Sequence, residues 1–201
     1  MSLAVGLAAI ALGSNLPSAY GDSAATLREA LHRLAALGRV TAVSRFYRTE
    51  PVGYLDQPEF VNAAALLETS LEPLDLLHAL LAIEAALGRR RSEDVPPKGP
   101  RTLDLDLLLY QKAALHAAQD TARNPALGAV RAGEATPHSL VLELPDLTLP
   151  HPAMQERRFV LEPLEEIAPE LRHPLLQRTV GELLDAIAAT GGRNAAPPAA
   201  T

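Results

Sequence analysis

The chain has 201 residues, of which 48% are hydrophobic, and this is a usual size for one domain that can bury its own core. It contains no cysteine, which excludes disulfides, thiolate metal sites and a cysteine nucleophile. Its formal net charge of -6 argues against a general nucleic-acid-binding surface. The lack of cysteine fits a reducing cytoplasm.

The first apolar run, residues 3–12, is too short to span a bilayer, which needs about 20 residues. It also lacks the basic start of a secretory signal, because the first positive side chain is Arg28. We therefore expect a cytoplasmic protein with no membrane partner. The run itself predicts a buried strand.

Two helices and three further strands are predicted after this first strand. Residues 22–37 have leucines at helical spacing, and Pro73 and Gly88 are typical of the start and end of a second helix. Residues 40–47 alternate in polarity, 60–69 are rich in apolar residues, and 102–110 alternate again. The order βαββαβ predicts an α+β, ferredoxin-like fold, with helices packed on one face of a mostly antiparallel sheet.

The rest of the chain is expected to complete a single domain over residues 1–190. Residues 111–139 have little apolar periodicity and predict a loose insertion, followed by a short returning strand at 139–144. Thr179 and Glu182 have the spacing of a capping box for a last helix. The Gly/Ala/Pro-rich segment 191–201 predicts a disordered tail.

The strongest chemical signal is Gly-Pro-Arg-Thr-Leu-Asp-Leu-Asp at residues 99–106. Strand alternation places Asp104 and Asp106 on one face, about 7 Å apart at Cα. Two carboxylates this close are unfavourable unless they are solvated or a cation lies between them, and such oxygen ligands suit Mg²⁺. The alternative is that they form the solvent-facing side of an amphipathic strand.

Phosphate binding, if present, must come from arginines and metal, because no glycine-rich phosphate loop occurs in the sequence. Basic residues gather in two short stretches, 89–101 and 157–158. They suit a small polyanionic ligand, although the run at Arg89, Arg90 and Arg91 also fits a solvated surface.

Three further side chains stand out. Phe60 and Phe159 lie in polar-flanked segments of a chain that has few aromatic residues, and Asn62 shares a strand face with Phe60. An amide offers donors and an acceptor to the edge of a heterocycle. Core packing explains either phenylalanine equally well, and His151, which lies between prolines, fits a turn residue.

Together these segments resemble the 6-hydroxymethyl-7,8-dihydropterin pyrophosphokinase family. The similar pieces occur in order along the chain, and the string at 99–106 is the most specific of them. They are residues 11–16, 44–49, 56–64, 99–106 and 149–159.

The resemblance implies transfer of the β,γ-diphosphate of ATP to the pterin hydroxymethyl group, with release of AMP, in folate biosynthesis. It implies two Mg²⁺ ions held by Asp104 and Asp106. The implied catalytic residues are Arg89, Arg91, Arg101, Asp104 and Asp106. The implied pterin-binding residues are Thr49, Val52, Phe60, Asn62 and Phe159. The implied ATP-binding residues are Glu84, Arg91, Arg101, Thr148, His151 and Arg157.

The sequence departs from that family in three places. Lys98 stands where the family commonly has a tryptophan that helps to cover the pterin. The loop at 89–98 is longer than usual, so the roles of its three arginines are open. The insertion replaces a short hairpin and has no assigned role. We expect a monomer whose partners are its small-molecule substrates.

Two other classes of protein are considered. A metal-dependent phosphohydrolase would use the carboxylates and arginines but gives no reason for Phe60, Asn62 and Phe159, and it would turn over ATP alone. A nucleic-acid-binding module would stack bases on exposed aromatics, but the net charge and the lack of the aromatic K/R-G-F/Y signature oppose it.

Overall fold

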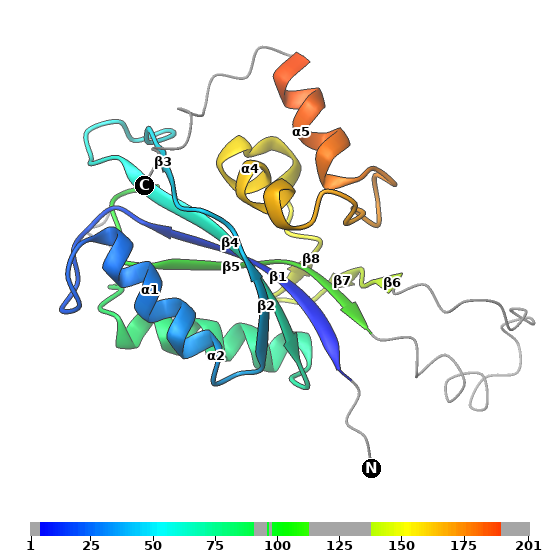
Figure 1. Cartoon of the computed structure of the whole chain (residues 1–201), viewed down its shortest axis with the longest axis horizontal. Helices are drawn as coiled ribbons and strands as arrows, with labels where there is room; N and C mark the ends of the chain where they lie inside the picture. Colours follow the sequence, from blue (N-terminus) through cyan, green and yellow to red (C-terminus); the bar gives the residue numbers. More distant parts are fainter. Residues whose placement is uncertain (1–4, 91–95, 97, 113–137, 190–201) are drawn as a thin grey trace, which may run out of the picture.

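A computed structural model describes residues 5–90, 96, 98–112 and 138–189 of the chain. Its centre is one antiparallel sheet with helices on both faces (Figure 1). In the part of the chain that is described, no helix is both long enough and apolar enough to cross a membrane.

The sheet has the strand order β2-β4-β1-β5-β6, and β3 pairs with β4 beside this path. Its strands are β1 (Gly6–Ser14), β2 (Arg39–Val43), β3 (Tyr47–Thr49), β4 (Phe60–Thr69), β5 (Asp104–Lys112) and β6 (His138–Ser139). The four long strands follow the order β5-β1-β4-β2 of a split βαβ sheet. The predicted α+β, ferredoxin-like core is therefore confirmed.

The first two helices cover one face of the sheet, and the last two cover the other (Figure 1). On the first face, α1 (Ser23–Leu34) and α2 (Pro73–Ala86) pack on Ile10 and Leu12 of β1. On the second face, α4 (Arg158–Ile167) and α5 (Val180–Ala189) pack on Ala9, Ala64 and Leu108. Between β5 and α4 the chain forms a small ladder and a single 3₁₀ turn. These are β7 (Leu142–Glu143), β8 (Thr148–Leu149) and η2 (Met154–Glu156).

Three details differ from the sequence-based expectations. Helix α4 was not predicted, and helices cover both faces of the sheet rather than one. The run at 40–47 forms two strands, because Ser44 turns to bond Ala64: its amide donates to the Ala64 carbonyl and its hydroxyl accepts from the Ala64 amide, both at 2.9 Å. Strict alternation would place Leu109 on the same face as Leu105 and Leu107. The register of β1 on β5 shifts after Ala9, however, so Leu109 packs with Leu108 on the other face.

The edges of the predicted insertion are strand residues. Gln111 pairs with Ser139, and Lys112 pairs with His138, in the β5–β6 ladder. The returning strand expected at 139–144 is divided between β6 and β7. The remainder of the insertion, residues 113–137, and the tail 191–201 lie outside the described residues.

The capping box predicted for the last helix is present. The Thr179 hydroxyl accepts from the Glu182 amide at 3.2 Å, and the Glu182 carboxylate accepts from the Thr179 amide at 2.8 Å. We expect Thr179→Ala to lower the free energy of unfolding by about 1 kcal/mol, because the first turn of α5 loses a partner. Thr179→Ser, which keeps the hydroxyl, should lose much less. Urea denaturation of both variants tests this, and equal losses would contradict it.

Candidate active site

A pocket of about 310 Å³ opens over β1, β4 and β5, beside the first turn of α4. Many of the residues singled out from the sequence line it together. They are Thr49, Val52, Phe60, Asn62, Arg101, Asp104, Asp106, Arg157 and Phe159.

Small residues of β1 form the base of this pocket. Ala11 and Gly13 both line it, and they lie two residues apart on one strand face. A Cβ atom added at Gly13 would lie 3.0 Å from the Asn62 side-chain oxygen. Larger side chains at these positions would therefore fill the space that the pocket now occupies.

One side of the pocket combines aromatic rings with a fixed amide. The Asn62 Nδ2 donates to the Thr49 hydroxyl at 2.7 Å, which holds the amide plane and leaves its oxygen as an acceptor. The Phe60 and Phe159 rings both line the pocket, from β4 and α4 respectively. The Arg101 guanidinium lies 5.8 Å from the centroid of the Phe60 ring. This side suits a flat, polar-edged heterocycle.

The other side of the pocket carries the paired carboxylates, surrounded by arginines from separate segments. Arg101 Nη1 lies 2.6 Å from Asp104 Oδ2, and Arg89 Nη1 lies 3.2 Å from Asp104 Oδ1. Arg157 Nη1 lies 3.7 Å from Asp106 Oδ2. The predicted placement of both carboxylates on one strand face is thus seen, and each has a cationic neighbour.

The charge on Asp106 is poorly compensated. Burial, and then the neighbouring charge of Asp104, raise the pKa of Asp106 to about 6, although the nearby arginines lower it. Within the described residues there is no cluster of three or more His, Cys, Asp or Glu side chains that could hold a metal ion. Two carboxylates alone fit Mg²⁺, which commonly takes one or two carboxylates and completes its shell with phosphate oxygens and water.

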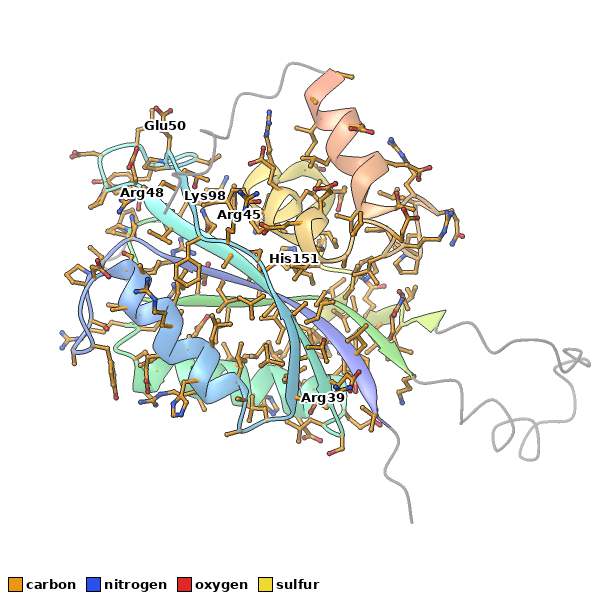
Figure 2. The ribbon with its side chains drawn as sticks, viewed as in Figure 1. Arg39, Arg45, Arg48, Glu50, Lys98 and His151 are labelled. Carbon is orange, nitrogen blue, oxygen red and sulfur yellow. The ribbon has the colours of Figure 1, made fainter. Side chains whose placement is uncertain are left out.

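A second pocket, of about 500 Å³, adjoins the first, and Asp106 lines both. Glu84, Thr148 and His151, all singled out as contacts of a nucleotide, line this second pocket together with apolar residues of α2. His151 lies near the middle of the molecule in Figure 2. Asp106 is therefore the residue that the two linings have in common.

His151 is held as a neutral donor. Burial and the charge of Arg157 lower its pKa, so the imidazole is uncharged at neutral pH. Its Nδ1 accepts from the Ala153 amide at 3.2 Å, which assigns the ring proton to Nε2. The ring can thus donate one hydrogen bond to a ligand.

Glu84 has a structural role as well as its place in the second pocket. Its side chain is buried, and Oε1 accepts at 2.8 Å from the amide of Leu105, the residue between the two carboxylates. At Leu105, β5 has β1 as a neighbour on one side only, because β6 pairs with β5 further along, at Gln111 and Lys112. An amide on the other side of the strand therefore needs a side-chain acceptor.

One predicted residue is not placed, and two important ones were not singled out. Arg91 lies outside the described residues, and Arg90 is exposed. The buried Asn15 accepts from the Arg101 amide at 2.8 Å and donates to Gln57 at 3.0 Å. Gln57 in turn donates to the Lys98 carbonyl at 2.9 Å. These amides join three loops at the rim. Both lie in segments that carry the family resemblance, 11–16 and 56–64, but the sequence assigned no role to either of them.

Lys98 lines the first pocket, as does Glu50, and Figure 2 shows it toward the end of the sheet where β3 lies. Its φ of 62° is unusual for a residue with a side chain. Its side chain crosses Gly53, where an added Cβ atom would lie 2.8 Å from the Lys98 Cδ.

Comparison with known proteins agrees with this geometry. Residues 9–169 match the model of the family described as 7,8-dihydro-6-hydroxymethylpterin-pyrophosphokinase (HPPK). A 2-amino-4-hydroxy-6-hydroxymethyldihydropteridine pyrophosphokinase of Pseudomonas aeruginosa is 44% identical over 165 residues, which cover 82% of each chain. The Bacillus subtilis enzyme of the same name is 40% identical over 168 residues, covering 82% of this chain and 80% of the relative.

Similar solved structures include longer chains. One, described as HPPK-DHPS in complex with substrates, superposes with a TM-score of 0.59 at 13% identity. It is matched over 92% of this chain but only 44% of its own length, so the present chain spans less than half of it. At this identity the likeness supports the fold alone.

These matches define the class of protein as an enzyme that transfers phosphate groups to a small heterocyclic substrate. The chain belongs to the 7,8-dihydro-6-hydroxymethylpterin-pyrophosphokinase family. Its reaction is the transfer of diphosphate from ATP to 6-hydroxymethyl-7,8-dihydropterin, which gives AMP and the pterin diphosphate in folate biosynthesis.

The contribution of the hydrogen bond between Glu84 and the Leu105 amide can be tested by measuring the free energy of unfolding. We expect Glu84→Ala to lower the free energy of unfolding by about 1–3 kcal/mol, because a buried amide on β5 loses its acceptor. Glu84→Gln keeps an acceptor oxygen at the same place and should lose clearly less. Urea unfolding measures both. Equal losses for the two variants would contradict a role for this hydrogen bond.

Proposed function

We propose that the first pocket binds the pterin, that the second binds ATP, and that diphosphate passes between them beside Asp106. The observation that carries this assignment is that Asp106 lines both pockets, while Phe60, Asn62 and Phe159 line only the first. A heterocycle held by aromatic rings then presents its substituent to the carboxylates.

In the pterin pocket, the rings of Phe60 and Phe159 would cover the two faces of the heterocycle. Asn62, fixed by Thr49, would read its polar edge, and the backbone near Thr49 and Val52 would add further hydrogen bonds. Stacking supplies affinity, while the amide supplies orientation.

In the ATP pocket, the phosphates would lie toward Asp106 and its arginines. His151 would donate from Nε2, and Arg157 would contribute charge from the border of the two pockets. Thr148 and Glu84 line this pocket but not the first one. Arg91 is assigned to the phosphates on the family resemblance alone.

Asp104 and Asp106 are proposed to hold two Mg²⁺ ions. When bound, the metal would neutralise phosphate charge and help to align the transferred group. The chain contributes the carboxylates, and with a pKa of about 6 Asp106 is largely ionised at neutral pH. Arg101 and Arg89, which pair with Asp104 in this structure, would be freed toward phosphate oxygens once a cation replaces them.

The pterin hydroxyl must attack in line with the β-phosphorus, and water must be kept out. The residues that orient the pterin are on β3, β4 and α4, whereas the charged groups are on β5 and the loops before and after it. We further propose that the chain acts as a monomer, because described residues of one chain line both pockets. We also propose that it acts in the cytoplasm, whose reducing conditions fit a chain without cysteine.

The metal assignment predicts a specific loss. Asp104→Ala and Asp106→Ala should each reduce AMP formation by at least about 10²-fold, which is about 2.7 kcal/mol of barrier, while the fold is kept. Added Mg²⁺ should recover part of the activity if metal affinity is what was lost. Single-turnover AMP formation across a Mg²⁺ titration measures this, with circular dichroism as the control for folding.

Arg101→Ala is the comparison variant in the same assay. A missing guanidinium is not replaced by filling a metal site, so its loss should not respond to Mg²⁺. Wild-type protein should release AMP rather than ADP, and only when pterin is present. Pterin-independent ATP hydrolysis would favour a phosphohydrolase, and near-normal rates in both folded Asp variants would refute the metal assignment.

Pterin stacking gives a second prediction. Phe60→Ala and Phe159→Ala should each weaken pterin binding by about 1–3 kcal/mol, by analogy with stacking of bases on aromatic side chains. Affinity for ATP should change much less, because neither ring lines the second pocket. Calorimetric titration with each ligand separates the two effects. Equal losses for both ligands would instead indicate general damage to the core.

A further inference from the structure

One carboxylate outside both pockets connects two elements that form the pterin pocket. Glu166, near the end of α4, accepts from the Tyr47 hydroxyl at 2.7 Å. It also accepts from the Arg45 amide at 3.2 Å and from the Arg45 Nε at 3.1 Å. Partial burial raises the pKa of Glu166, but these hydrogen bonds outweigh it and the net shift is downward, so the group is ionised at neutral pH.

On the sheet side, this link ends in the short strand that carries Thr49. Tyr47 and Thr49 lie two residues apart on β3, so they share one strand face, and both are buried. Tyr47 is paired with Asn62 in the β3–β4 ladder, and Thr49 is paired with Phe60. A group that holds Tyr47 therefore acts on the strand that fixes the Asn62 amide.

On the helix side, the link lies on the same face as Phe159. Glu166 follows Phe159 by seven residues, which is about 10 Å along the axis and within about 20° of two full turns. A bond at Glu166 thus restrains both the approach of α4 to β3 and the rotation of α4 about its axis. Rotation of α4 decides whether the Phe159 ring faces the pocket.

We propose that Glu166 is a positioning residue for pterin binding. It holds β3 and α4 at the separation that lets Phe60 and Phe159 contact the two faces of the pterin ring. This inference rests on the proposed placement of the pterin in the first pocket. Glu166 does not line that pocket, so it acts through Tyr47 and through the orientation of α4.

A simple surface ion pair would not have this effect. Exposed pairs contribute little, and Arg45 by itself is such a residue, with 64% of its side chain exposed. The Tyr47 hydroxyl and the Arg45 amide differ from it, because the first belongs to a buried side chain and the second to the backbone. Three donors from one short segment converge on a single carboxylate.

The chain offers a matched control in Glu68. Its carboxylate pairs with Arg39 at 2.6 Å across β2 and β4, and Arg39 is also exposed. Figure 2 shows Arg39 well away from Arg45, toward the opposite end of the sheet. Glu68→Ala removes a cross-element ion pair of the same kind without touching the pocket.

The test compares Glu166→Ala, Glu166→Gln, Tyr47→Phe and Glu68→Ala in steady-state assays of AMP formation, with KM measured separately for pterin and for ATP. Glu166→Ala should raise the KM for pterin about tenfold, a size that fits the loss of charge-assisted hydrogen bonds, and should leave the KM for ATP within about twofold. Glu166→Gln keeps an acceptor for Tyr47 and should recover part of the loss. Tyr47→Phe should show a smaller rise, and Glu68→Ala none.

Thermal unfolding of each variant separates positioning from general destabilisation. An unchanged KM for pterin in folded Glu166→Ala would overturn the inference, as would an equal rise in both KM values. If Glu166→Ala does not fold, Tyr47→Phe decides, because it removes a single oxygen. Wild-type protein that forms no pterin-dependent AMP would overturn the proposed function and this inference together, whereas active wild-type protein with unaffected variants would overturn the inference alone.

Discussion

Asp104 and Asp106 lie two residues apart on one face of β5, and their mutual repulsion is the constraint around which the neighbouring charges are arranged. Arginines from the end of α2, from the loop before β5 and from the turn before α4 approach the pair. They do not fully compensate it, because burial and the charge of Asp104 still raise the pKa of Asp106 to about 6. A site of this kind gains stability when a further cation enters, which is a property that a phosphate-transferring enzyme can use.

The space beside this pair exists because β1 carries small side chains there. Ala11 and Gly13 leave room above the sheet, whereas Ile10 and Leu12, on the other face, pack against α1 and α2. One strand therefore contributes to the core on one side and to a cavity on the other. The first turn of α4 borders the cavity and contributes Phe159 to its lining.

Much of this could be predicted from local patterns. Strand alternation is a property of the backbone, so the shared face of Asp104 and Asp106, and that of Phe60 and Asn62, followed from sequence spacing. Helix α4 could not be predicted in this way, because Pro163 lies within it and interrupts the helical sequence pattern. Its packing also depends on the face of the sheet opposite to α1 and α2. The contact of Arg89 with Asp104 is likewise tertiary, since it joins the end of α2 to β5. The joining role of Asn15 needed three loops to be placed at once.

The two pockets also differ in whether their contacts can stay as they are when ligands bind. The groups in or next to the proposed pterin pocket are fixed to one another by hydrogen bonds already present, such as Asn62 to Thr49 and Tyr47 to Glu166. The groups on the phosphate side are instead paired with each other, as Arg101 is with Asp104, and those pairs must be exchanged when ligands arrive. On the proposed assignment, the pterin side is preorganised. On the phosphate side, binding costs the free energy of breaking ion pairs that are already present. Because Asp106 lines both pockets, a cation that neutralises it from the proposed nucleotide side also removes a partly buried charge from the lining of the first pocket.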